Sequence, residues 1–116
     1  MRVYILDEQV ESREQILKWL SENKKLTGIE VFEDYALFVE QVGKSPPDFG
    51  IIRLGGNEIP GLKVGEMVKQ ISPDVRIIFI SDDRKSALDA YELGAYGYLL
   101  CPLLKDKFEN CLKQIV

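Results

Sequence analysis

The chain has 116 residues, of which 46% are hydrophobic and 29% charged, and its formal net charge is −4. This length is typical of one domain, residues 1–116, and this composition excludes a disordered tail. The acidic balance disfavours binding to phosphate backbones or anionic lipid, so we expect no direct nucleic-acid contact and no membrane contact. No apolar run approaches the roughly 18 residues of a membrane helix, and the first residues become acidic too early for a signal peptide. We therefore expect a cytoplasmic protein.

The chain contains no histidine and two cysteines, Cys101 and Cys111. The absence of histidine excludes Ser-His and Cys-His catalysis and histidine-ligated metal sites. Two cysteines are too few for a structural zinc site, which typically needs four Cys or His ligands. We expect both thiols to be buried and free.

Short apolar runs alternate with segments of helical periodicity along the whole chain. In chain order the pattern predicts strand 3–6, a helix around 16–20, strand 29–32, a helix around 35–42, strand 49–54, helix 64–71, strand 75–80, a helix around 88–95, strand 98–100 and a helix around 104–115. Most of the strands are continuously apolar, which is typical of a parallel sheet covered on both faces. The run 29–32 alternates with polar residues, which indicates an edge strand.

Apolar side chains recur at helical spacing in the segments between the strands. We expect Leu88, Tyr91 and Ala95 to lie along the fourth helix, and we assign Trp19, Met67 and Phe108 to the core. Five strand–helix pairs in alternation predict an α/β fold with a doubly wound parallel sheet. In such sheets functional residues lie beyond the carboxyl ends of the strands.

Two carboxylates, Asp7 and Glu8, follow the first predicted strand, where a phosphate-binding loop is absent. Adjacent carboxylates repel a bare phosphate but suit a hard cation such as Mg²⁺. Residues 53–57, 81–83 and 101–102 follow the third, fourth and fifth strands, so they belong to the same candidate site.

Five stretches of the chain carry a family resemblance: residues 4–8, 47–52, 59–61, 77–81 and 87–102. In these stretches, and over its full length, the chain resembles the receiver domain of bacterial two-component response regulators. The last stretch looks most like receivers that precede LytTR-type or SARP-type effector domains. The resemblance implies the flavodoxin-like, CheY-like (βα)5 fold with strand order 2-1-3-4-5.

The resemblance also implies roles for individual residues. Asp7 and Glu8 match the acidic pair that holds Mg²⁺, Ser81 matches the hydroxyl that follows the phosphoryl group, and Tyr98 matches the switch aromatic. Pro102 matches a proline that follows the family's lysine, and we expect its preceding peptide bond to be cis.

Two positions depart from the family pattern. Arg53 stands where the phosphoacceptor aspartate belongs, and Cys101 stands where the lysine belongs. A guanidinium stays protonated and is not a phosphoryl acceptor. Four other carboxylates are poorly placed as replacement acceptors: Asp48, Glu58, Asp82 and Asp83. We therefore expect a pseudo-receiver that is not an enzyme, has no cofactor and binds Mg²⁺ weakly or not at all.

The arginine has two alternative placements. In the first, Arg53 lies between Asp7 and Glu8 and replaces the positive charge of the metal, holding the site in one state. In the second, Arg53 points to solvent and the pocket has only lost its function. A redox role for Cys101 is a further alternative, since a neighbouring arginine lowers the pKa of a thiol.

Receivers usually signal through the face formed by the fourth helix, the last strand and the last helix. Six residues of this face are candidate interface residues: Tyr91, Tyr96, Lys105, Asp106, Lys107 and Lys113. We expect this face to contact a protein partner, the chain's own effector domain or a second copy. Two other functions stay open: a receiver phosphorylated on a non-standard acceptor, and a domain that senses a small anion at Arg53.

Overall fold

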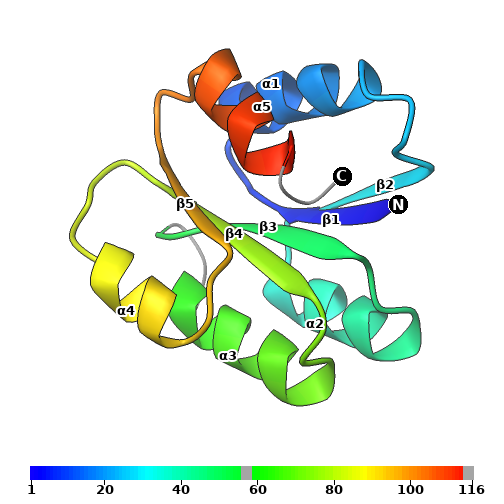
Figure 1. Ribbon diagram of the computed structural model, residues 1–116. Coiled ribbons are helices and arrows are strands. Elements are labelled where there is room, and N and C mark those ends of the chain that lie inside the picture. Colours follow the sequence, from blue (N-terminus) through cyan, green and yellow to red (C-terminus); the bar gives the residue numbers. More distant parts are fainter. Residues whose placement is uncertain (56–58, 114–116) are drawn as a thin grey trace.

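The computed structural model describes residues 1–55 and 59–113, which form a parallel sheet with helices on both faces (Figure 1). The strands are β1 (Arg2–Leu6), β2 (Gly28–Phe32), β3 (Phe49–Arg53), β4 (Arg76–Ser81) and β5 (Gly97–Leu100). The helices are α1 (Val10–Ser21), α2 (Tyr35–Lys44), α3 (Gly61–Ile71), α4 (Ala87–Glu92) and α5 (Lys105–Lys113). The strand order is β2-β1-β3-β4-β5, so the predicted fold and topology are confirmed.

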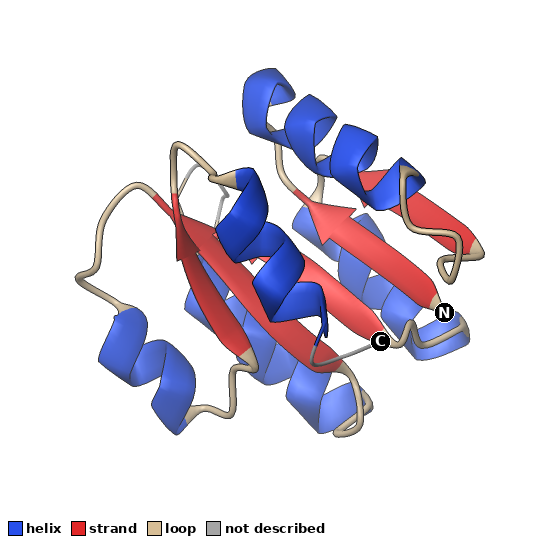
Figure 2. Ribbon diagram, turned by 45° about the horizontal axis from the view of Figure 1, so that its top comes forward, coloured by secondary structure: helices blue, strands red, loops and turns tan. Residues whose placement is uncertain are grey.

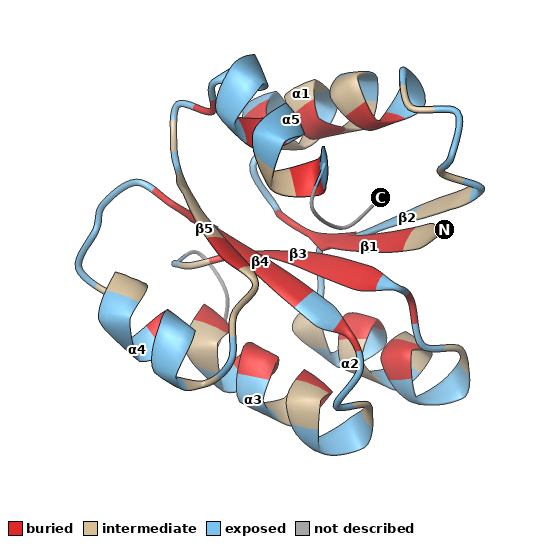
Figure 3. Cartoon of the chain, in the orientation of Figure 1, coloured by how far each residue is buried: buried red, intermediate tan, exposed pale blue. Residues whose placement is uncertain are grey.

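Helices α1 and α5 cover one face of the sheet, and α2, α3 and α4 cover the other; Figure 2 shows the helices in front of and behind the strands. Each face has its own apolar core. The first core contains Ile16, Phe108 and strand residues such as Ile51, and the second contains Phe38 and Val64. Every residue of β3 is buried because the strand is central and covered on both faces (Figure 3).

Strand β2 lies at an edge of the sheet and pairs only with β1, as its alternating pattern predicts. Its burial is correspondingly incomplete, and Val31 remains 37% exposed. An edge strand with one solvated face needs fewer apolar residues than a central strand.

Helix α4 corrects the sequence prediction. The helix has six residues, and Gly94 follows it with φ of 101°, a left-handed conformation that favours glycine and ends helices. Ala95 therefore lies beyond the helix. Leu88 and Tyr91, which were expected to lie along this helix, do so and are 71% and 52% exposed, because Ala90 is the residue of α4 that faces the sheet.

The residues assigned to the core on the other helices are buried to different degrees. Phe108 of α5 is fully buried, but Trp19 of α1 and Met67 of α3 are only half-buried. Both side chains lie at the margin of their apolar stripe, where a helix surface turns from the sheet toward solvent.

Candidate functional site

Four polar residues meet where strands β1, β3, β4 and β5 end. Asp7 directly follows β1, Arg53 ends β3, Ser81 ends β4 and Cys101 directly follows β5. Because all strands are parallel, their carboxyl ends lie at one edge of the sheet. The parallel topology thus brings together residues that are up to 94 positions apart in the sequence.

Arg53 lies inside the protein and forms a salt bridge with Asp7. Its Nε donates to Asp7 Oδ1 at 2.7 Å, and the two side chains are 2% and 0% exposed. Arg53 Nη2 also donates to Ser12 Oγ at 2.7 Å, while Ser12 Oγ donates to Asp7 Oδ2 at 2.5 Å. The three side chains therefore form a closed ring of charge-assisted hydrogen bonds, which are stronger than neutral ones.

Both carboxylate oxygens of Asp7 are engaged by donors from the chain itself. The backbone N–H of Gln9 donates to Asp7 Oδ1 at 3.0 Å, in addition to Arg53. Helix α1 begins at Val10, so the buried Asp7 also lies next to a helix N-terminus, where negative charge is stabilised. This donor set compensates the cost of burying the carboxylate.

The predicted pairing of Arg53 with Glu8 is wrong. Glu8 is exposed, and no salt bridge joins it to Arg53 within residues 1–55 and 59–113. The physical reason is alternation: Asp7 continues the extended backbone of β1 through its N–H to Phe32 O, so its neighbour projects away. Among the described residues, Asp82 is another carboxylate near Arg53, and its Oδ1 lies 3.7 Å from Arg53 Nη1.

Ser12 is the member of the ring that sequence analysis missed. It is buried together with Ile16 and Leu20, at spacings of four residues along α1. A buried serine needs a polar partner. The spacing of Ser12 with Ile16 and Leu20 is visible in the sequence and would have predicted that Ser12 faces the sheet. The sequence pattern does not predict that Asp82 lies near Arg53, because the distance between them depends on the path of the loop after β4.

Cys101 lies at the outer side of the same site. Its Sγ accepts a hydrogen bond from Arg53 Nη2 at 3.4 Å. Burial raises the pKa of the Cys101 thiol, and this effect outweighs the opposing influence of Arg53. Burial opposes the charge of Arg53, but the hydrogen bond and the Coulomb attraction to Asp7 outweigh it and raise the pKa of Arg53. Cys101 is therefore a protonated thiol at neutral pH, which disfavours the redox alternative.

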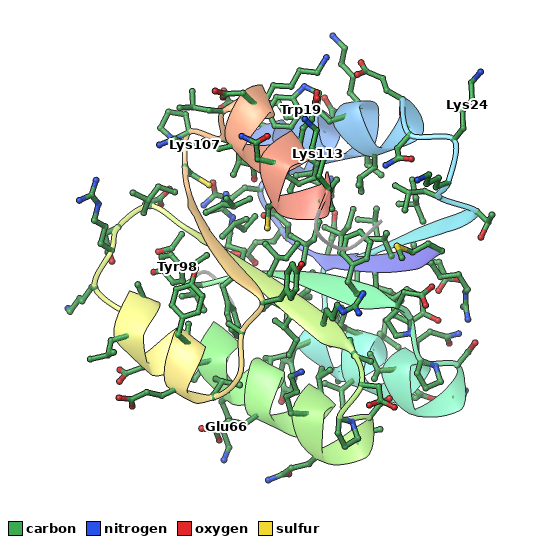
Figure 4. All side chains as sticks on the ribbon, in the orientation of Figure 1. Trp19, Lys24, Glu66, Tyr98, Lys107 and Lys113 are labelled. Atoms are coloured by element: carbon green, nitrogen blue, oxygen red, sulfur yellow. The ribbon has the colours of Figure 1, made fainter. Side chains whose placement is uncertain are left out.

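The loop after β4 is attached to the site through Ser81 and Tyr98. Ser81 is buried, and its Oγ accepts a hydrogen bond from the Asp83 N–H at 3.3 Å. The Tyr98 hydroxyl donates to the Asp83 carbonyl oxygen at 2.8 Å, and Figure 4 shows the ring between β5 and α4. The peptide bond between Cys101 and Pro102 is cis.

The remaining predicted positions are spread around the molecule. Asp48 lies at the opposite end of β3 from Arg53 and accepts a hydrogen bond from the Arg2 N–H at 2.6 Å. Asp83 is exposed, and Glu58 lies outside the described residues. A shallow pocket of about 190 Å³ opens next to Arg53, Asp82 and Cys101.

The six candidate interface residues do not share one orientation. Tyr91, Asp106 and Lys107 are exposed, whereas Tyr96 is half-buried beneath Arg76, whose guanidinium carbon lies 5.8 Å from the ring centroid.

Lys105 forms a salt bridge with Glu22, which directly follows α1, at 3.0 Å. Lys113 lines a groove that also contains Trp19 of α1. Lys105 and Lys113 therefore lie on the side of α5 toward the end of α1.

The family model for the response regulator receiver domain matches residues 3–113. The chain belongs to this family. The receiver domain is 29% identical over 120 residues to the transcriptional regulatory protein BtsR of Escherichia coli K12, covering 99% of the chain and 48% of BtsR. It is 21% identical over 114 residues to the sensory transduction protein LytT of Bacillus anthracis, covering 98% of the chain and 46% of LytT. The chain thus spans about half the length of these curated relatives.

Solved structures agree on the fold of the receiver domain. The response regulatory domain of mrkE from Klebsiella pneumoniae superposes with a TM-score of 0.91 at 18% identity, covering 99% of this chain and 94% of that one. A LuxR-family response regulator from Aurantimonas sp. SI85-9A1 superposes with a TM-score of 0.88 at 18% identity, covering 98% of this chain and 83% of that one. Over residues 1–55 and 59–113 of the receiver domain, no helix has the length and apolar character needed to cross a bilayer.

Proposed function

We propose that this receiver domain works without phosphorylation and signals by binding protein partners. The observation that carries the proposal is the buried salt bridge between Arg53 and Asp7. By resemblance to the family, Arg53 takes the place of the phosphoacceptor aspartate and Cys101 the place of the lysine. The domain then has neither the nucleophile nor the cation that phosphoryl transfer requires, so it is not an enzyme.

The residues at this edge of the sheet do not fit Mg²⁺. Asp7 already accepts hydrogen bonds on both oxygens, and the Arg53 guanidinium lies against Oδ1, where its charge opposes a divalent cation. Glu8 is exposed, and within the described parts of the chain no three Asp, Glu or Cys side chains are close enough together to hold a metal. We infer that the domain functions without a metal or cofactor.

Arg53 supplies the internal positive charge instead. Hydrogen bonds to charged partners contribute about 1.5–3 kcal/mol each when buried, and Arg53 makes two within the ring, to Asp7 and Ser12. Because it also reaches Asp82 and Cys101, it joins the residue after β1, helix α1, the loop after β4 and the turn after β5. This network holds the site in one arrangement, so a partner binds a fixed surface.

The partner surface that we propose is the face of α4, β5 and α5. Leu88 and Tyr91 of α4, Leu100 of β5 and Leu104, which directly precedes α5, present large exposed apolar side chains. Exposed apolar side chains that gather on one face mark interaction sites. BtsR is a transcriptional regulator about twice as long as this chain. We infer that the domain acts in signal transduction or transcription regulation in the cytoplasm, through its own effector domain, a separate partner or a second copy.

The proposal is tested by the intact mass of the protein after incubation with acetyl phosphate and Mg²⁺, next to an ordinary receiver as positive control. We expect no phosphoryl adduct on this chain under conditions that label the control. A stable adduct on any carboxylate contradicts the proposal and supports a non-standard acceptor. Titration with inorganic phosphate, followed by thermal unfolding, tests the anion-sensing alternative; a concentration-dependent rise in Tm that Arg53→Met abolishes supports that alternative.

A further inference from the structure

A groove of about 470 Å³ lies between the end of α1 and the last turns of α5. It is on the layer of α1 and α5, and α1 begins beside Asp7 and ends at the groove. Twelve helical residues span about 18 Å, so the groove lies far from Arg53, toward the opposite edge of the sheet. It is also on the other side of the sheet from the exposed α4 residues (Figure 1).

The floor of the groove is apolar and rigid. Trp19 and Leu112 line it, and the Trp19 ring packs on Phe108 with ring centroids 5.5 Å apart. Phe108 is fully buried, so it holds the indole in place, yet Trp19 itself remains half-buried and presents surface to the groove. A half-buried indole supported from below is a good anchor for an apolar side chain.

The rim of the groove is positive, although the chain as a whole is acidic. Lys24 and Lys113 line the groove, are exposed and form no salt bridge in the described parts of the chain; Figure 4 shows Trp19 and Lys113 between the two helices and Lys24 projecting after α1. Two glutamates also line it, but Lys105 pairs with both, at 3.0 Å to Glu22 and 3.8 Å to Glu109.

We propose that this groove binds an acidic peptide segment of a protein partner, with an apolar side chain on Trp19 and carboxylates at Lys24 and Lys113. The groove is open to solvent, which leaves it accessible to a peptide segment. Its apolar floor and the two glutamates disfavour a continuous polyanion such as nucleic acid. The groove shares α5 with the proposed face of α4, β5 and α5 but lies on the side of α5 toward α1, and the proposal holds whether or not the domain is phosphorylated.

Trp19 is the sole tryptophan of the chain, so its fluorescence reports directly on the groove. The probe is a synthetic peptide, acetyl-Glu-Glu-Leu-Phe-Glu-Asp-Leu-amide, which contains no tryptophan. We expect it to shift the Trp19 emission in a saturable manner that weakens with added salt. The peptide with Gln and Asn in place of its acids should bind about tenfold more weakly, the loss of roughly 1.4 kcal/mol expected for two or three rim contacts.

Charge reversal tests the rim. Lys24→Glu/Lys113→Glu should weaken peptide binding at least about tenfold, and Lys24→Gln/Lys113→Gln should give a smaller loss. The matched control is Lys44→Glu/Lys63→Glu, which changes the net charge equally but lies on α2 and α3. The proposal is overturned if the acidic peptide leaves the Trp19 emission unchanged or if the neutral peptide binds as tightly as the acidic one. It is also overturned if the control variant weakens binding as much as the Lys24/Lys113 variant.

Discussion

Arg53 Nε lies 2.7 Å from Asp7 Oδ1, with both side chains almost completely buried. Removing both partners of a buried ion pair is often nearly neutral, whereas removing one leaves an uncompensated buried charge. Because of this asymmetry, the free energies of unfolding of the single and double variants differ if Arg53 stabilises the fold. They do not differ if the burial of Arg53 is accidental.

Arg53→Met keeps much of the side-chain volume and leaves Asp7 charged. We expect the free energy of unfolding to fall by about 3–5 kcal/mol, the cost of an unpaired buried charge. Asp7→Asn/Arg53→Met should lose less than Arg53→Met alone, because no buried charge remains. Urea unfolding measures all three. Arg84→Met, at an exposed arginine, is the control, and a loss below about 1 kcal/mol for Arg53→Met contradicts the account.

Arg53→Asp introduces a carboxylate at the position that, by resemblance to the family, matches the phosphoacceptor. We expect this variant to remain poorly labelled by acetyl phosphate with Mg²⁺, because Cys101 supplies no cation for the phosphoryl group. Arg53→Asp/Cys101→Lys should be labelled more, as measured by intact mass. Efficient labelling of the single variant, in a preparation that remains folded by circular dichroism, would contradict the role that we infer for a lysine at position 101.

Gly97 lies so close to Cys111 of α5 that the clash caused by a side chain at position 97 should be relieved by a smaller residue at position 111. A Cβ at Gly97 would lie 2.7 Å from Cys111 Sγ, and its next neighbours, on Ile78, are at an ordinary 3.7 Å. We expect Gly97→Ala to cost about 1–3 kcal/mol by overpacking. Because the clash is with one atom, Gly97→Ala/Cys111→Ala should cost less than the sum of the single variants. Strict additivity in urea unfolding would be inconsistent with this contact.

Leu88 is exposed on α4, so its substitution separates binding from folding. We expect Leu88→Glu to change the free energy of unfolding by no more than about 0.5 kcal/mol, whereas Phe108→Ala should cost about 3–5 kcal/mol. If the α4, β5 and α5 face joins two copies, Leu88→Glu lowers the association seen in sedimentation velocity. A large loss of stability in Leu88→Glu would mean that the side chain packs within the domain.

Burial shifts the pKa values of both thiols, so the free energy of unfolding should change with pH in the alkaline range. Burial raises the pKa of Cys101 and of Cys111. The unfolded chain loses these protons near pH 8.5 while the folded chain keeps them, so the contribution is complete below about pH 8.5 and is lost as the pH rises through the folded pKa values. Under reducing conditions, urea unfolding from pH 7 to 10 should show a steeper loss for the natural chain than for Cys101→Ala/Cys111→Ala. If the free energies of unfolding of the two proteins fall in parallel with pH, the raised pKa values of the thiols are contradicted.

The short-range pattern was sufficient for most of the fold. Continuous apolar runs such as Ile77–Ile80 mark buried parallel strands, and the alternation in Gly28–Phe32 marks an edge strand, because each pattern depends on how many faces of the strand are covered. The exact ends of elements were less certain. The fourth helix was predicted too long, since the left-handed Gly94 stops it two residues after Glu92.

The sequence by itself determined the fold class, the strand order through the family resemblance, and the presence of Arg53 and Cys101 at the ends of β3 and β5. Only the tertiary structure decided which partners Arg53 has. Asp7 points inward and Glu8 outward, and Ser12 of α1 completes the ring of hydrogen bonds. Periodicity depends on neighbours along the chain, whereas a buried charge is compensated by whichever donors and acceptors the packing of distant elements brings within hydrogen-bond distance.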